Sequence, residues 1–173
     1  MGNIEIERVT LSKIELLQVI CRQTFFETFS EVNTEENMNK YLEDSFNISK
    51  LTSEIENENS EIYFAIHNNK VVGYLKINVG DAQTELKSDK TLELERIYVL
   101  KEFQGKKLGQ ILFDKAFEIA EQKKAEYLWL GVWEENHKAL KFYLKNGFTA
   151  FDKHVFILGN DVQTDIMMRL PIS

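Results

Sequence analysis

The chain has 173 residues, of which 43% are hydrophobic and 28% charged, with a formal net charge of −7, so it is long enough for one domain with a proper core. The acidic balance argues against nucleic acid as the main partner, because phosphate backbones attract basic surfaces, and it is compatible with a cationic substrate. No apolar run approaches the ~18 residues of a membrane span, and the single cysteine, Cys21, excludes an internal disulfide.

The segment from Met1 to Glu5 lacks the basic start and the apolar stretch of a signal peptide, and a lone cysteine fits a reducing compartment. We therefore expect a cytoplasmic protein without a membrane partner. No repeat, low-complexity segment or linker divides the chain, which predicts a single domain over residues 1–173. The sequence leaves a monomer and a homodimer both open.

Helical patterns dominate the first third of the chain. A strand over residues 4–10 precedes a helix from Lys13 to Phe29, for which Ser12 and Glu15 form a capping box. Two further helices are expected, namely one capped by Asn33 or Thr34 and a polar surface helix from Ile48 to about Asn57.

The hydrophobic period then changes from helical to alternating. A hairpin joins residues 62–66 to residues 71–79 through the turn at Asn68-Asn69-Lys70. A polar surface loop over residues 80–90 leads to the next strand, at residues 92–100.

Strands and helices alternate in the remainder. After a glycine-containing turn and a helix comes a run of strand formers at residues 127–132. Asn136 caps a short helix that Asn146-Gly147 closes, and a last hairpin joins residues 149–158 to residues 162–170. The order β-α-α-α-β-β-β-α-β-α-β-β is typical of an α/β domain with a mixed sheet.

The strand at residues 92–100, the turn Gln104–Gly109 and the helix after it together form a phosphate-binding device. Glycines let the backbone approach a ligand, and the free N–H groups of a helix's first turn point at it. Lys106 and Lys107 add positive charge where the helix dipole already favours an anion. We interpret the stretch as a pyrophosphate cradle; the alternative is an ordinary strand-to-helix connection. The Rossmann and P-loop patterns are both absent.

This stretch resembles motif A of the GNAT acetyltransferase superfamily, through Leu94-x-x-Ile97-x-Val99 and the turn Gln104–Gly109. The resemblance implies that the loop amides hold the pyrophosphate of acetyl-coenzyme A. The middle glycine of the family's Q-x-x-G-x-G pattern is Lys107 here, and left-handed backbone there would cost about 1 kcal/mol. We expect Lys107 to lie already in the first helical turn, where it costs nothing and adds a cation.

A second segment, Asn136-x-x-Ala139-x-x-Phe142-Tyr143-x-x-Asn146-Gly147-Phe148, resembles motif B of the same superfamily. Two motifs in the right order are more specific than either alone. In the family, the strands that carry the motifs splay apart around the pantetheine arm. The resemblance thus implies a GNAT-type α/β domain whose mixed, mostly antiparallel sheet splays between residues 92–100 and 127–132, with helices on both faces.

The resemblance also implies the residues that contact the coenzyme. Asn136 would bind the coenzyme arm by its side chain, and Ile97 and Val99 would bind it by their backbone. The full implied set is Ile97, Tyr98, Val99, Gln104, Gly105, Lys106, Lys107, Leu108, Gly109, Gln110, Asn136, Ala139, Phe142 and Lys145.

Two residues are candidates for proton transfer. Tyr143 would be the general acid, because a phenol keeps its proton at pH 7 and can give it to the leaving thiolate; the alternative is a core tyrosine. Glu93 stands where some family members carry a base carboxylate, and its alternative is a solvated glutamate at a strand edge. None of His67, His137 and His154 has a partner at metal-ligand spacing, so no metal is assigned.

The flanking segments resemble the bacterial PaiA-type polyamine acetyltransferases of that superfamily, whose acceptors are spermidine and spermine. The resembling segments are residues 95–99, 130–134, 163–167 and 26–29. A small cationic amine is thus the expected partner, with Glu27, Glu31 and Phe29 on its binding groove. The alternatives are a protein N-terminus or lysine as acceptor, and a coenzyme A sensor without turnover.

Overall fold

The computed structural model describes residues 3–172 of the chain, so Met1 and Gly2, which open the segment inspected for a signal peptide, lie outside the described residues. Within that range a seven-stranded sheet runs in the order β1-β2-β3-β4-β5-β7-β6, antiparallel except between β4 and β5. The strands are β1 (Ile4–Arg8), β2 (Ser60–His67), β3 (Lys70–Val79), β4 (Thr91–Val99), β5 (Tyr127–Trp133), β6 (Thr149–Leu158) and β7 (Asp161–Pro171). The expected α/β class and element order are confirmed.

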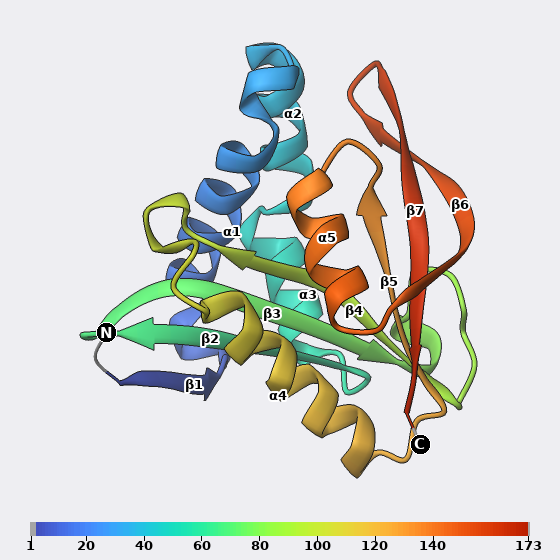
Figure 1. Ribbon diagram of the computed structural model, residues 1–173. Coiled ribbons are helices and arrows are strands. Elements are labelled where there is room, and N and C mark those ends of the chain that lie inside the picture. The colour runs from blue at the N-terminus through green and yellow to red at the C-terminus, as the bar shows by residue number, and fades with distance from the viewer. Residues whose placement is uncertain (1–2, 173) are drawn as a thin grey trace.

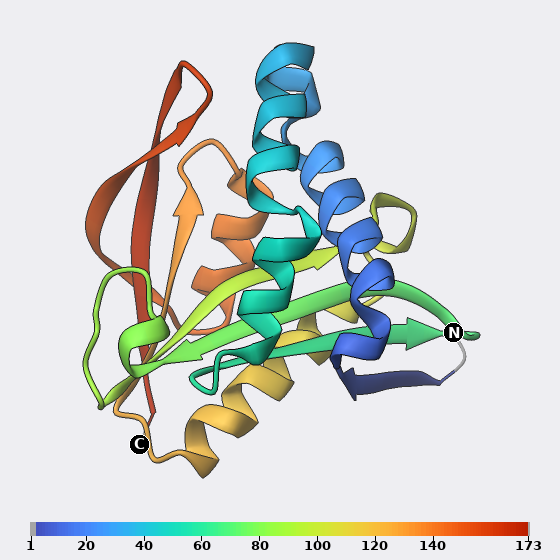
Figure 2. The same cartoon turned by 180° about the vertical axis from the view of Figure 1, so that it is seen from behind.

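Helices cover both faces of the sheet (Figures 1 and 2). They are α1 (Ile14–Phe29), α2 (Glu35–Ser45), α3 (Ile48–Glu56), α4 (Leu108–Gln122) and α5 (His137–Lys145). One hydrophobic core joins the sheet to α4 and α5, and a second joins it to α1, α2 and α3. None of the helices within residues 3–172 is long and apolar enough to span a membrane.

A β-bulge in β4 changes which side chains face each core. Lys76 pairs with Arg96 but the next residue, Ile77, pairs with Leu94, so Glu95 is the extra residue. Before the bulge, Leu94 lies in the core under α4; after it, Tyr98 contacts the core under α1. The bulge therefore turns the charged segment of β4 towards the α1 side of the sheet.

Strands β4 and β5 separate soon after they begin. Their parallel pairing covers only residues 91–93 against 127–129, although β4 continues to Val99 and β5 to Trp133. The splay inferred from the family resemblance is thus present, and it opens a space between the two strands in the middle of the sheet.

Local signals fixed several element boundaries. Thr34 caps α2 by accepting from Asn37 N–H, and the Asn68-Asn69 turn has the positive φ angles, 49° and 63°, of a tight hairpin. The capping box at Ser12 is wrong: a 3₁₀ turn over Leu11–Lys13 precedes α1, and Lys13 is its N-cap without a side-chain bond.

The loop between β3 and β4 is anchored at its base, whereas the sequence suggested only a polar surface loop. A 3₁₀ turn at Gly80–Ala82 opens it, and Gln83 is buried. The indole N–H of Trp129 donates to Oε1 of Gln83 at 2.8 Å, and the Thr91 hydroxyl donates to the same oxygen at 2.8 Å. These bonds hold the next residue, Thr84, against β4.

Candidate active site

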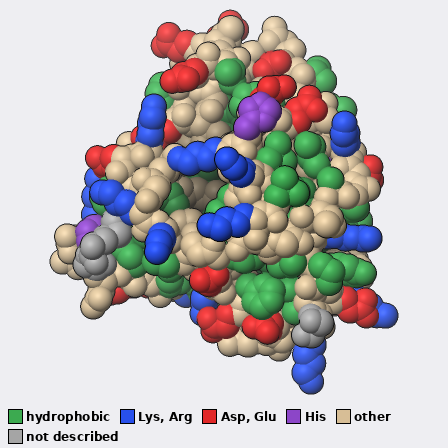
Figure 3. Space-filling model, in the orientation of Figure 1, with side chains coloured by type: hydrophobic (Ala, Val, Ile, Leu, Met, Phe, Trp, Pro, Cys, Tyr) green, Lys and Arg blue, Asp and Glu red, His purple; other side chains and the backbone are tan. Residues whose placement is uncertain are grey.

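A cavity of about 1210 Å³ occupies the space between β4 and β5. Its lining comes from α1, α2, β4, the start of α4, β5, α5 and the β6–β7 hairpin. On the face seen in Figure 3, lysine and arginine side chains gather around a hollow. Every residue assigned to a site from the sequence, except Lys106, lines this cavity.

The turn before α4 presents backbone to the cavity. Gly105 has φ +79°, which favours glycine, and a Cβ added at Gly109 would meet nothing within 4 Å. Both residues line the cavity, as do Leu108 and Gln110 in the first turn of α4. The free N–H groups of a helix's first turn form an anion site, so the geometry fits the predicted pyrophosphate cradle.

Lys107 is not in the first helical turn, and that expectation is wrong. It is the N-cap of α4 in left-handed conformation, with φ 66° and ψ 13°. A non-glycine residue there costs roughly 1–2 kcal/mol. This left-handed backbone explains why the family has glycine at this position, and in this chain Lys107 adopts it despite that cost. Lys107 also lines the cavity.

Lysines surround the cradle end of the cavity. The lining lysines there are Lys101, Lys107, Lys138 and Lys145, of which the sequence analysis had singled out two. Lys106 is not part of the lining, and its ammonium lies 5.3 Å from the ring centroid of Phe103, which does line the cavity.

Gln104 connects the turn to β4 and to α5. Its side-chain N–H donates to the Val99 carbonyl at 3.1 Å, and its oxygen accepts from Nζ of Lys138 at 3.0 Å. The Val99 carbonyl thus already has one donor within the chain. The side chain of Asn136 caps α5 by accepting from Ala139 N–H at 3.2 Å, which leaves its amide N–H group and one lone pair of its oxygen for a ligand.

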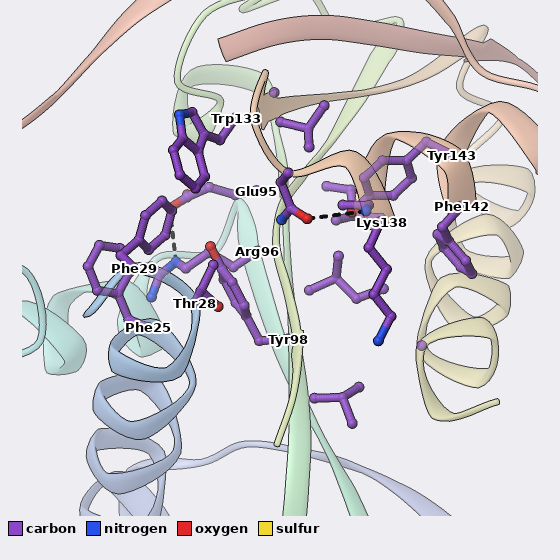
Figure 4. Close-up of a pocket in the computed structure, with 18 of the residues that line it drawn as sticks. Phe25, Thr28, Phe29, Glu95, Arg96, Tyr98, Trp133, Lys138, Phe142 and Tyr143 are labelled. Carbon is purple, nitrogen blue, oxygen red and sulfur yellow. Dashed lines mark hydrogen bonds and ion pairs between the residues drawn. The ribbon is translucent and has the colours of Figure 1, made fainter. Parts of the chain in front are cut away.

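Tyr143 lies on the α5 side of the cavity, beside Phe142 (Figure 4). It is 7% exposed and packs edge-on against Phe142 and Phe148, with ring centroids 5.5 Å away in each case. Burial raises the pKa of its phenol, which keeps the proton on the oxygen. No hydrogen bond occupies its hydroxyl among residues 3–172, so the group is free to donate into the cavity.

Glu93 is buried, at 3% exposure, and not a solvated edge residue. Its carboxylate accepts from Thr84 N–H at 2.8 Å, from the Thr84 hydroxyl at 2.5 Å and from the Asn78 amide at 3.0 Å. Burial raises the pKa of Glu93, and the bonds from Thr84 and Asn78 oppose that rise. A carboxylate whose pKa is raised in a cavity is suited to accept a proton near neutral pH.

A buried ionic network, which the sequence analysis missed, lies next to Glu93. Glu95 accepts from Nζ of Lys76 at 2.7 Å and from Nε of Arg96 at 3.1 Å, and Arg96 also reaches Glu54 of α3 at 2.5 Å. Burial alone would raise the pKa of Glu95, but Arg96 and Lys76 lower it to about 2. Glu95 therefore remains a paired anion. The sequence shows these charged residues, but it does not predict the β-bulge at Glu95 that brings them together.

Aromatic rings form the opposite side of the cavity (Figure 4). Phe29 lies 5.4 Å from Trp133 and 6.1 Å from Phe156, and Phe25 stacks on Tyr41 at 4.3 Å. All five residues line the cavity. Faces of aromatic rings attract cations and pack on methylene chains.

The predicted acceptor carboxylates differ in their environments. Glu27 lines the cavity, but its Oε1 accepts from the backbone N–H of Lys101 at 2.9 Å. Glu31 lines the cavity and is exposed. Phe26, beside them in the sequence, is 51% exposed and outside the lining. Glu31 is thus the better placed of the two to attract a cation.

The cavity therefore has two chemically different sides. One side combines a helix N-terminus with lysines and suits a phosphorylated ligand; the other combines aromatic rings with carboxylates and suits a cation. Tyr143 and Glu93 both face this shared space. Among residues 3–172, no group of three or more His, Cys, Asp or Glu could hold a metal ion.

A model of the Acetyltransferase (GNAT) family matches residues 21–148. An uncharacterised N-acetyltransferase in the pepI 3′ region of Lactobacillus delbrueckii subsp. lactis is 42% identical over 169 residues, 98% of each chain. The spermidine N(1)-acetyltransferase of Thermoplasma acidophilum is 26% identical over 154 residues, 87% of this chain and 91% of that protein. A crystal structure of PaiA N-acetyltransferase from Thermoplasma acidophilum, in complex with coenzyme A, matches with a TM-score of 0.81 at 24% identity, over 98% of this chain and 99% of that one.

Proposed function

The chain belongs to the GNAT family of acetyltransferases, and we propose that it transfers the acetyl group of acetyl-coenzyme A to a primary amine of a polyamine such as spermidine or spermine. The enzyme class follows from the family. The polyamine acceptor, the direct attack in a ternary complex and the roles of the individual residues are the proposed parts.

The donor fits the cradle side of the cavity. The first-turn N–H groups of α4 would hold the pyrophosphate, next to the open space over Gly109. Lys107 and Lys138 would add positive charge, and Ile97 would bind the arm through its backbone. Bound acetyl-coenzyme A supplies the thioester that the amine attacks.

Two side chains of this chain would move the protons. Glu93, directly or through a water molecule, would accept the proton that an ammonium group must lose before it attacks. Tyr143 would donate its phenolic proton to the sulfur that leaves as thiolate. Burial raises both pKa values, which keeps the proton on Tyr143 and makes the deprotonated carboxylate of Glu93 a stronger proton acceptor.

The acceptor side supports a flexible polycation. Phe29 and Trp133 offer ring faces to methylene groups and cations, while Glu31 offers an exposed negative charge. A relative named for spermidine acetylation is 26% identical over 87% of this chain and 91% of its own length. The observation that carries the proposal is that one cavity is lined both by the aromatic rings and carboxylate described here and by the turn before α4, which is the predicted phosphate cradle.

An acceptor screen tests the proposal. Purified protein, acetyl-coenzyme A and a panel of polyamines, aminoglycosides and peptides are compared by the thiol released. We expect the highest kcat/KM for spermidine or spermine, falling with added salt, because exposed charges are screened over ~8–10 Å near physiological ionic strength. Glu31→Gln should raise KM for spermidine, whereas Glu36→Gln, an exposed change outside the lining, should not.

Other results would identify other functions. Preference for peptides would move the acceptor to a protein N-terminus or lysine. Tight coenzyme A binding without thiol release on any acceptor would indicate a sensor.

A further inference from the structure

One carboxylate in the cavity has an oxygen with no donor. Asp165 of β7 lines the cavity, and its Oδ1 is buried without a hydrogen-bond partner among the described residues. Its other oxygen, Oδ2, lies 3.4 Å from Nε2 of His154 on β6. Burial raises the pKa of Asp165, and His154 lowers it. A buried acceptor without a donor is costly, so this oxygen is suited to a ligand that brings one.

The other buried or half-buried carboxylates of the cavity already have donors. The donors are Lys76, Asn78 and Arg96 for Glu95, Thr84 and Asn78 for Glu93, Arg96 for Glu54, and the Lys101 N–H for Glu27. Among the described residues, Asp165 is therefore the cavity carboxylate whose buried oxygen still lacks a donor.

A missing side chain opens the way to Asp165. Gly131 of β5 lines the cavity, and a Cβ there would lie 3.3 Å from Cε1 of His154 and 3.7 Å from Oδ2 of Asp165. Trp133, which pairs with Asp165 across β5 and β7, lies in the aromatic wall (Figure 4). An alkyl chain can thus pass over Gly131, with an aromatic face beside it and Asp165 at its end.

We propose that Asp165 binds a second, non-reacting ammonium group of the acceptor and so selects diamines and polyamines over monoamines. In the sheet, β7 lies two strands from β4, which is roughly 10 Å at ~4.8 Å per strand. Asp165 pairs with Trp133, which lies four residues along β5 from the Trp129 that pairs with Glu93, so roughly 13 Å along the strands separates them as well, at ~3.3 Å per residue. A reacting amine near Glu93 and an ammonium at Asp165 would therefore belong to one molecule with several methylenes between them. This inference rests on the proposed function and specifies its acceptor pocket.

His154 lies beside two carboxylates, Asp165 from β7 and Glu85 from the loop before β4, each 3.4 Å from a ring nitrogen.

Calorimetric titration of spermidine into the protein saturated with coenzyme A tests the subsite without turnover. We expect Asp165→Asn to raise the dissociation constant at least about tenfold, as for loss of a bond between charged groups, and to leave coenzyme A affinity unchanged. Asp152→Asn, an exposed change on neighbouring β6 outside the cavity, is the control. Gly131→Ala narrows the same passage and should also weaken the binding of spermidine.

The outcomes separate the two proposals. Unchanged spermidine affinity in Asp165→Asn, or no spermidine binding by the parent, overturns the Asp165 subsite. Spermidine binding that depends on Asp165 without acetyl transfer keeps the subsite and refutes polyamine acetylation. If polyamines are acetylated and Asp165→Asn keeps the parent's preference for spermidine over butylamine, the proposed function stands and the subsite is wrong.

Discussion

Thr84 binds the carboxylate of Glu93 twice, through its backbone N–H at 2.8 Å and its hydroxyl at 2.5 Å. The contact joins the loop after β3 to the charged face of β4. It also sets the acidity of Glu93, because bonds donated to a carboxylate favour its charged form and oppose the effect of burial.

The acidic limb of the pH–kcat profile should report Glu93. A base works unprotonated, so activity falls as pH drops through its pKa, which burial raises above the ordinary 4.5. Thr84→Val removes one stabilising bond, raises the pKa further and should move the limb to higher pH. Thr91→Val, which loosens the same loop at Gln83 without touching Glu93, should leave it in place. If the pH–kcat profile of Thr84→Val is the same as that of the parent, Glu93 is not the catalytic base.

Tyr143→Phe should lower kcat by about 10²–10⁴-fold, the usual contribution of a general acid. The affinity for coenzyme A should change little, because the proton is needed only as charge develops on sulfur. Tyr127→Phe removes a phenol from β5 outside the cavity and serves as the matched control. A Tyr143→Phe rate within twofold of the parent would show that Tyr143 serves packing against Phe142 and Phe148 alone.

Gly109→Asp should weaken coenzyme A binding strongly. The new carboxylate would stand in open space over the first turn of α4, where an anionic ligand is expected, and would repel it. Calorimetry with coenzyme A measures the effect. Gln122→Glu adds the same charge at the far end of α4 and should have little influence. Equal affinities for Gly109→Asp and the parent would contradict the cradle.

Local sequence patterns predict much of the fold, but they do not predict which residues come together on the acceptor side of the cavity. Helical and alternating periods predicted every strand and α-helix in order, and two motifs singled out the Gln104–Gly109 turn and Tyr143, which lie at the cavity. The wrong expectation for Lys107 shows the limit of such reasoning, because backbone φ at a helix start depends on the neighbouring turn as well as on residue preference.

The residues that were missed depend on distant strand pairing. Asp165 and His154 face each other only because β6 and β7 pair in that register. Trp133 joins them because β5 pairs with β7. Likewise, Glu54 meets Arg96 across 42 positions of the chain. No spacing rule along the sequence brings such residues together. The sequence therefore shows that these residues are present, but it does not show that they lie close to one another.

Glu95→Gln should destabilise the protein at pH 7 by on the order of 3–5 kcal/mol, because it leaves the buried cations Lys76 and Arg96 without a full anionic partner. Chemical denaturation measures the change, and Glu56→Gln, an exposed change at the end of α3, should fall within about 0.5 kcal/mol of the parent.

The pH dependence of that difference identifies its cause. Arg96 and Lys76 lower the folded-state pKa of Glu95 from 4.5 to about 2. A carboxylate with a lowered pKa contributes stability that is present above its unfolded pKa and is lost as pH falls through the folded value. The parent's advantage over Glu95→Gln should therefore shrink between about pH 4.5 and pH 2, where the carboxylate becomes as neutral as the amide. A difference that stays constant from pH 7 to pH 3 would instead assign the loss to side-chain packing, and the buried charges of β4 would then contribute little to the stability of the site they surround.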